Sequence, residues 1–165
     1  LGAVRWVPPL EASRALVAAL HAARPQGLAT EVFAFGRMPL AFSARCFTAR
    51  HFGLNRDDCQ YRCIEHPDGL GLATREGEDF LVINGIQTQS ARRHTLLAEF
   101  ADLGRMGIDA VRISPQSHHT AEILAAFAAA RAGQAVATDA AWSPEGYANG
   151  YWRGTAGIAM QESGA

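Results

Sequence analysis

Apolar and polar residues alternate with two different periods along the first part of the chain, and these periods predict a strand, a helix and a second strand. Residues 4–7 are a short apolar run of the kind that forms a buried strand. Residues 10–24 place apolar side chains at three- and four-residue spacings, which predicts an amphipathic helix. Residues 31–35 predict the next strand, closed by Gly36. This order favours parallel strands joined by a helical crossover.

The second half of the chain continues the alternation. Residues 91–105 predict a helix, residues 108–113 a third strand of the parallel series, and residues 119–131 a third helix. The side chains expected to face inward are Leu96, Leu97, Phe100 and Leu103 in the first of these helices and Ile123, Leu124 and Phe127 in the second. From residue 134 onward the period fades, and interleaved aromatic residues predict a tail that packs on the domain.

A stretch with neither clean period lies between these two series. Residues 37–67 predict a long loop with a helical turn or two near residues 43–52. The runs 70–75 and 79–83 flank a Glu-Gly-Glu turn and predict a β-hairpin, and Asn84-Gly85 predicts another turn. A loop of this length inside a compact domain usually carries function, so we expect the site there.

The predicted fold class is α/β, in a partial TIM-barrel-like (β/α) arrangement with a long cysteine-bearing loop and a β-hairpin insert. Three parallel strands and three helices cannot close an eight-strand barrel, but they correspond to about half of one. The chain begins at Leu1 rather than at methionine and enters a strand almost at once. We therefore expect residues 1–165 to be a single domain that forms the C-terminal half of a longer barrel protein.

Composition narrows the classes of function. Hydrophobic residues make up 48% and charged residues 19% of the chain, which is ordinary for a globular protein. The net charge of −1 provides no field that would attract nucleic acid or an anionic membrane. There is no secretory segment and no apolar run of about eighteen residues, so we expect a cytoplasmic protein with no membrane span.

The strongest chemical signal is the grouping of all three cysteines. Cys46, Cys59 and Cys63 lie within residues 31–67, and an odd number of thiols favours a reducing compartment. Thiolates hold iron–sulfur clusters, whereas zinc accepts three cysteines and one histidine, here His51 or His66. The spacing alone does not decide between a metal or cluster site, ordinary reduced cysteines and redox-active thiols.

Other polar residues are weaker candidates. His118-His119 with Glu122 resembles a metal pair, but capping of the following helix is the more common role of such residues. Asp57-Asp58 has the chemistry of a general acid or base, yet a turn cap explains it better. Glu31 starts a strand, either to reach a site or to pair with an arginine. Residues 84–89 form either a site wall at a strand end or a simple turn.

Three segments, FAFGRMPLAFSARCFTARHFGL, DDCQYRC and NGIQTQS, carry a resemblance to a known family. The chain resembles the UbiV family of anaerobic ubiquinone-biosynthesis proteins, within the collagenase-like peptidase superfamily, over nearly its whole length. That resemblance implies a TIM-barrel-like protein with a 4Fe–4S cluster on four cysteines. Three of these ligands correspond to Cys46, Cys59 and Cys63, and the fourth is absent from this sequence.

The resemblance also implies partners and an activity. A UbiU-like protein is the expected heterodimer partner, together with a lipid-binding accessory protein, in oxygen-independent hydroxylation during ubiquinone biosynthesis. Two alternatives remain: a peptidase of the superfamily, or a structural zinc or partner-binding module. Peptidase-like relatives carry a Lys-Ile-Glu-Gly-Arg-like passage where this chain reads Arg112-Ile113-Ser114-Pro115-Gln116. The missing acidic residue counts against peptidase chemistry.

Overall fold

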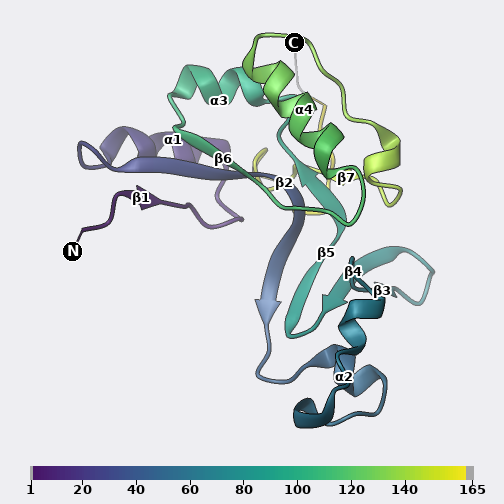
Figure 1. Cartoon of the computed structure of the whole chain (residues 1–165). Coiled ribbons are helices and arrows are strands. Elements are labelled where there is room, and N and C mark those ends of the chain that lie inside the picture. Colours follow the sequence, from purple (N-terminus) through teal and green to yellow (C-terminus); the bar gives the residue numbers. More distant parts are fainter. Residues whose placement is uncertain (1, 163–165) are drawn as a thin grey trace.

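The computed structural model describes residues 2–162 as a seven-stranded mixed sheet with helices packed on it (Figure 1). The strands are β1 (Arg5–Trp6), β2 (Ala29–Phe42), β3 (Leu70–Ala73), β4 (Asp79–Asn84), β5 (Gln87–Thr95), β6 (Ala110–Ile113) and β7 (Tyr147–Ala148). The helices are α1 (Arg14–Ala23), α2 (Phe47–His51), α3 (Phe100–Met106) and α4 (Thr120–Arg131), with 3₁₀ turns η1 (Arg56–Asp58), η2 (Arg62–Glu65) and η3 (Ala140–Trp142). The mixed α/β class is confirmed, but the sheet is not closed into a barrel.

Strand β2 organises the sheet, whose strand order is β1-β2-β5-β4-β3 with β6 paired to β2 and β7 to β5. Its first half pairs in parallel with β1 and β6, so the predicted parallel series is confirmed. Its second half pairs antiparallel with β5, where Arg37 lies opposite Arg93. In Figure 1 this second half leaves the helix-covered part and runs with β5 to a lower part that holds α2, β3 and β4. We call residues 37–42, 79–84 and 87–92 the arm.

Helix α1 begins where a side chain can cap it. Ser13 Oγ accepts a hydrogen bond from the Leu16 N–H at 3.3 Å, so the helix starts at Arg14 rather than at residue 10. Its buried face carries Val17 and His21, and His21 Nδ1 lies 2.8 Å from Thr30 Oγ1 of β2. The hydrogen bond satisfies a polar group that packing has removed from water.

The core lies between the first half of β2 and helices α1, α3 and α4. Phe35 of β2 is completely buried, and its ring centroid lies 6.1 Å from Phe127, 6.5 Å from Trp142 and 6.3 Å from Tyr147, edge to face. Ile123 and Phe127 of α4 face this core as predicted. The prediction for Leu124 is wrong, because half of its surface remains exposed.

The predicted helix over residues 91–105 is wrong in its first half. Residues up to Thr95 belong to β5, and α3 occupies only Phe100–Met106. Backbone pairing of β5 with β2, β4 and β7 satisfies its hydrogen-bonding groups, which overrides the local helical period. Leu96 and Leu97 are still buried, so the apolar spacing identified core residues while misassigning their backbone.

The predicted end of the second strand at Gly36 is also wrong. β2 continues to Phe42, with register shifts on either side of Pro39, so residues 37–42 are strand rather than loop. Gly36 has a φ of +126°, and a Cβ there would lie 2.5 Å from the Cβ of Ser114. Glycine therefore lets β2 bend past the loop that follows β6 without ending the strand.

Most of the remaining local predictions hold. β3 and β4 form the predicted antiparallel hairpin. The turn predicted at Asn84-Gly85 lies one residue later, at Gly85-Ile86, because Asn84 ends β4 and pairs with Gln87 of β5. The tail packs back on the domain, since Trp152 is buried and its carbonyl accepts the Arg14 N–H at 2.9 Å. Within residues 2–162, no helix combines the length and apolar character needed to cross a membrane.

Candidate functional site

All three cysteines lie on one small unit at the far end of the arm. This unit, which we call the cysteine lobe, comprises residues 43–69 and contains α2, η1 and η2. Two hydrogen bonds attach it to the turn between β4 and β5. Phe47 N–H donates to the Gly85 carbonyl at 2.9 Å, and Gly85 N–H donates to Thr48 Oγ1 at 3.0 Å. The lobe therefore lies apart from helices α1, α3 and α4, at the far end of β2 and β5 (Figure 1).

Each thiol sits at or beside a short helical turn. Cys46 precedes α2, and its Sγ accepts the Ala49 N–H at 3.4 Å. Cys59 closes η1, and Cys63 lies within η2. All three are free and half-buried. A backbone N–H donated to sulfur is one of the means by which proteins tune a thiolate-bound cluster.

The three thiols lie in the same lobe but do not form a single-metal site. Within the described part of the chain, no three His, Cys, Asp or Glu side chains are grouped closely enough to hold a single metal ion. A cluster makes a different demand, because each cysteine binds its own iron atom. Thiols are the donors that iron–sulfur clusters use, so Cys46, Cys59 and Cys63 are the candidate ligands for such a group in this lobe.

The two histidines considered as a fourth ligand both pack against Phe52, His51 edge to face and His66 stacked on the ring. The Phe52 ring centroid lies 4.9 Å from that of His51 and 5.7 Å from that of His66. The guanidinium of Arg62 lies over the same ring at 5.5 Å. Packing against Phe52 is therefore enough to explain the position of both imidazole rings.

The lobe is nearly devoid of a hydrophobic core. Among its described side chains only Thr48 and Ala49 are buried, whereas Tyr61 and Ile64 are 72% and 76% exposed. Between Cys59 and Cys63, the backbone of Gln60 and Tyr61 has φ of +52° at both residues, a left-handed conformation that costs side-chain-bearing residues energy. Strain of this kind persists when something else holds the segment in place.

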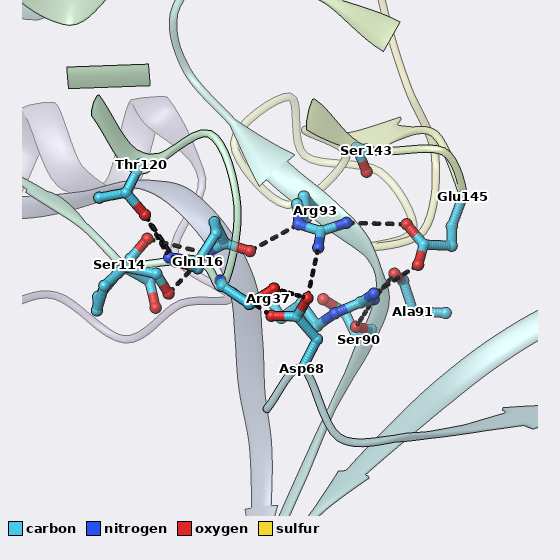
Figure 2. Close-up of polar contacts among 12 residues, drawn as sticks. Arg37, Asp68, Ser90, Ala91, Arg93, Ser114, Gln116, Thr120, Ser143 and Glu145 are labelled. Atoms are coloured by element: carbon cyan, nitrogen blue, oxygen red, sulfur yellow. Dashed lines mark hydrogen bonds and ion pairs between the residues drawn. The ribbon is translucent and has the colours of Figure 1, made fainter. Parts of the chain in front are cut away.

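A second group of polar side chains lies where β2 leaves the helix-covered part of the sheet (Figure 2). Arg37 of β2 and Arg93 of β5 both pair with Glu145, at 2.6 Å and 2.9 Å. Arg37 also donates to the backbone carbonyls of Ser90 and Ala91. We call these residues, with Asp68 and Gln116, the arginine cluster.

The arginine cluster joins the cysteine lobe to the loop after β6. Asp68, at the end of the lobe, accepts the Ser117 N–H at 3.2 Å and the Ser117 hydroxyl, and its carboxylate lies 4.0 Å from Arg93. Gln116, from the same loop, accepts Arg93 Nε–H at 2.6 Å. A change in the position of the lobe would therefore alter the electrostatic interactions of Asp68 with both arginines.

Charge within the arginine cluster is balanced. Burial, followed by the charge of Arg37, lowers the pKa of Arg93. Burial opposes ionisation of Glu145 and Asp68, but hydrogen bonds and the two arginines outweigh it and lower both pKa values. The result is two buried cations facing two ionised carboxylates.

A pocket of about 140 Å³ opens beside the cluster. Its lining residues are Arg37, Pro67, Asp68, Asn84, Gln89, Ser114, Pro115 and Gln116. It lies at the carboxyl end of β6, the edge at which α/β folds place their ligands. The lining offers a hydroxyl, a carboxylate, side-chain amides and a guanidinium, so the pocket suits binding of polar groups.

Most of this cluster escaped sequence reasoning. Only residues 84–89 and the passage 112–116 were singled out. Asn84, Gln89 and Gln116 do line the pocket, and Asn84 also pairs with Gln87 across a turn. Of the two roles considered for Glu31, the structure shows pairing with arginine, at 2.7 Å from Arg5 and 2.6 Å from Arg112. The arginine and carboxylate positions carry no local motif that marks them as neighbours.

The remaining candidates stay apart from both groups. Asp57 and Asp58 are exposed in the first turn of η1, where no side-chain cap bond forms. His119 precedes α4 with φ of +62°, and its Nδ1 lies 3.3 Å from Glu122 in the first turn. A helix-start role for His119 therefore fits better than a metal pair.

Comparison with known proteins returned one family. The model described as Peptidase family U32 matches residues 1–142, which include the whole cysteine lobe and all of the arginine cluster except Glu145. No solved structure matches the chain.

Proposed function

Because the chain belongs to peptidase family U32, and because its three thiols gather on a lobe that lacks a core, we propose that it binds a 4Fe–4S cluster. Cys46, Cys59 and Cys63 are the proposed ligands, and the fourth comes from a residue outside this sequence. The coreless lobe is the observation that carries the proposal. Small units that cannot bury enough apolar surface are commonly held together by a metal centre.

The strained turn supports the same assignment. Gln60 and Tyr61 reverse the chain between Cys59 and Cys63 in a conformation unfavourable for both residues. Binding of both flanking thiolates to one cluster would compensate this cost. The Ala49 N–H near Cys46 Sγ is a ready donor to a bound thiolate.

The proposed role is a UbiV-like subunit in oxygen-independent hydroxylation during ubiquinone biosynthesis. It rests on the resemblance of residues 33–63 and 84–90 to that family, and it brings a UbiU-like heterodimer partner, a lipid-binding accessory protein and a cytoplasmic location. The cluster would supply electron transfer or oxygen-atom chemistry when bound. The chain's own residues supply its ligands and the polar pocket beside Asp68.

The proposed architecture is a partial TIM-barrel-like unit. Parallel strands β1, β2 and β6, with α1 as a crossover, follow the (β/α) order of such a barrel. In this proposal residues 1–165 are the C-terminal half of a longer barrel, and the cysteine lobe lies beyond the carboxyl ends of its strands.

Anaerobic reconstitution of the full chain with iron and sulfide tests the cluster. We expect a brown protein with about four irons per chain when all ligands are present, and an iron content that falls sharply in Cys46→Ser, Cys59→Ser and Cys63→Ser. Reconstitution alone and together with a UbiU-like partner distinguishes a fourth ligand on that partner from one elsewhere. The matched control is His66→Asn, in the same lobe, which should keep its iron.

A colourless protein that holds one zinc ion, and loses it in His66→Asn, would reject the cluster in favour of a structural zinc or partner-binding module. Metal analysis therefore separates these two candidates, whereas capture of a UbiU-like chain does not.

The family name itself favours a second candidate, a peptidase. This activity would hydrolyse a peptide bond and survive Cys46→Ala, because the thiols would not take part. Incubation of the wild-type and Cys46→Ala chains with denatured collagen, followed by mass spectrometry, tests it. Absence of cleavage by both rejects this candidate.

A further inference from the structure

The arm has a second, apolar side, on the face opposite the arginine cluster. Successive residues of a strand point to opposite faces, and Arg37 lines the polar pocket while Met38 and Leu40 line another one. This apolar pocket lies between the arm and residues 148–158 of the tail, and its volume is about 270 Å³. None of its lining residues is a cysteine or a member of the 84–89 segment.

Two layers build the apolar pocket. Its floor contains the buried residues Met38, Ala91 and Ala148. Its rim contains Leu40, Phe80 and Ile158, which remain between 37% and 50% exposed. A rigid floor with an open apolar rim is the form of a small-molecule site, which a protein lines mainly with apolar groups.

The tail wall is held in place by two contacts. Arg92 Nη1–H donates to the carbonyl of Ile158 at 3.1 Å. A Cβ on Gly157 would lie 2.4 Å from Cζ of Tyr151, so glycine is what allows the tail backbone to lie against that ring. The pocket is thus formed by specific contacts and not by a loose approach of two segments.

Size and lining define the apolar part of an occupant. A cavity of roughly 150 Å³ is enough to hold benzene in a protein interior, so the available volume accommodates one substituted ring. Two aromatic side chains, Phe80 and Tyr151, are among the lining residues, and aromatic rings pack well against a planar ring.

The charge of the lining indicates what the polar part of an occupant would be. Arg92 is the only charged residue of the lining. No carboxylate of residues 2–162 lies within ion-pair distance of it, in contrast to the neighbouring Arg93. Only one N–H of Arg92 is used in the contact with Ile158, so further N–H groups can donate. A planar guanidinium beside apolar surface can bind a carboxylate or phosphate through two such donors.

We propose that this pocket binds a small molecule that combines one apolar ring with one anionic group, the ring lying between Phe80 and Tyr151 and the anion pairing with Arg92. The proposal does not depend on the cluster or on its ligands. Carboxylate and phosphate share the required chemistry, and the probes below distinguish them.

Methyl-labelled methionine provides a direct test on the whole chain. The protein has three methionines. Met38 lies in the floor of the pocket, Met106 lies on α3, and Met160 follows the lining residue Ile158 by two positions. We expect millimolar benzoate or phenyl phosphate to shift the Met38 methyl signal and leave that of Met106 unmoved. Benzyl alcohol should bind more weakly, since it lacks the charge.

Two variants make the test specific. Arg92→Gln should weaken benzoate binding about tenfold and change benzyl alcohol binding by less than about twofold, since a charge-assisted hydrogen bond is lost. Leu40→Trp, on the exposed rim, should abolish binding of both by filling the pocket. Arg75→Gln, on the β3–β4 turn outside the pocket, is the matched control and should bind as the wild type does.

Three results would overturn the proposal: no shift of Met38 with any probe, equal binding of benzoate by the wild type and Arg92→Gln, or unchanged binding by Leu40→Trp. Far-ultraviolet circular dichroism of each variant establishes that it is folded before it is titrated. The cysteines are not altered in any arm, so the result is independent of the cluster.

Discussion

The helix-covered part of the sheet and the cysteine lobe are stabilised by different means. Phe35, Leu96 and Leu103 in the first are at most 2% exposed, whereas the described side chains of the lobe include only Thr48 and Ala49 as buried residues. The first therefore owes its stability to buried apolar surface, and the second to hydrogen bonds at its base and to the contacts of Asp68. The proposed cluster would bind in the second part, away from the apolar core.

The largest expected effect comes from removing the central ring of the core. Phe35→Ala should lower the free energy of unfolding by about 4 kcal/mol, because the substitution leaves a cavity among Phe127, Trp142 and Tyr147. Urea denaturation followed by circular dichroism measures this. Phe42→Ala, near the lobe and 71% exposed, should cost less than about 0.5 kcal/mol. Similar losses for both would contradict the division between the two parts.

The next effect concerns the arginine cluster between them. Glu145→Gln should cost about 3 kcal/mol, since Arg37 and Arg93 would remain buried side by side without their shared carboxylate. The same denaturation experiment measures the loss. Its counterpart in the lobe is Glu65→Gln, which breaks an exposed pair with Arg62 and should change stability by less than about 0.5 kcal/mol. An equal loss in both variants would show that burial does not set the strength of these pairs.

The third expected effect is a pH dependence that belongs to the core. Burial lowers the pKa of His94 to about 4 in the folded protein, despite a hydrogen bond with the Phe33 backbone. The unfolded chain, with a pKa near 6.5, binds a proton at pH values where the folded chain does not, so falling pH stabilises the unfolded state.

Between pH 7 and pH 5 this proton uptake should remove about 2 kcal/mol of stability. The free energy of unfolding of the wild type and of His94→Gln, measured at both pH values, tests the assignment. His94→Gln should lack this part of the dependence. A wild-type slope in the variant would assign the effect to other groups.

Asp68→Asn should have the smallest effect on the stability of the whole protein. Its effect should instead be confined to the cysteine lobe. The change weakens the contacts with Ser117 and Arg93, and Asp68 is partly exposed, so total stability should fall by no more than about 1 kcal/mol. Hydrogen exchange should nevertheless accelerate in residues 43–69 while β2 and β6 remain protected. Asp57→Asn, exposed in η1, is the control. Uniform acceleration across the sheet would contradict a role for Asp68 at the base of the lobe.

Local sequence patterns predicted those elements that local interactions determine. The β3–β4 hairpin, α4, the parallel pairing of β6 and, to within one residue, the turn after β4 were all predictable, since turn chemistry and apolar period act over a few residues. The helix expected at residues 91–105 failed because β5 is paired on both sides. Such pairing depends on strands distant in sequence, which a local window does not contain.

The two parts of the candidate site were predictable to different degrees. The cysteines are close in sequence, so their confinement to one lobe could be expected, while their binding of a cluster stays a prediction. Arg37, Arg93 and Glu145 come from three separate parts of the chain. Their meeting depends on the register of β2 with β5, because a shift of one strand by one residue would place the two arginines on opposite faces of the sheet.

The sequence by itself thus determined that this is an α/β chain of family U32 with its thiols in one short segment, because composition, period and family motif are properties of neighbouring residues. Only the tertiary structure decided that the segment is a lobe almost without a core on an extended arm, that an arginine cluster joins it to the sheet, and that the reverse face of the arm holds an apolar pocket whose lining includes one guanidinium. The physical reason is that burial and charge pairing are set by which strands meet and in which register. Neither quantity is defined until the chain has folded.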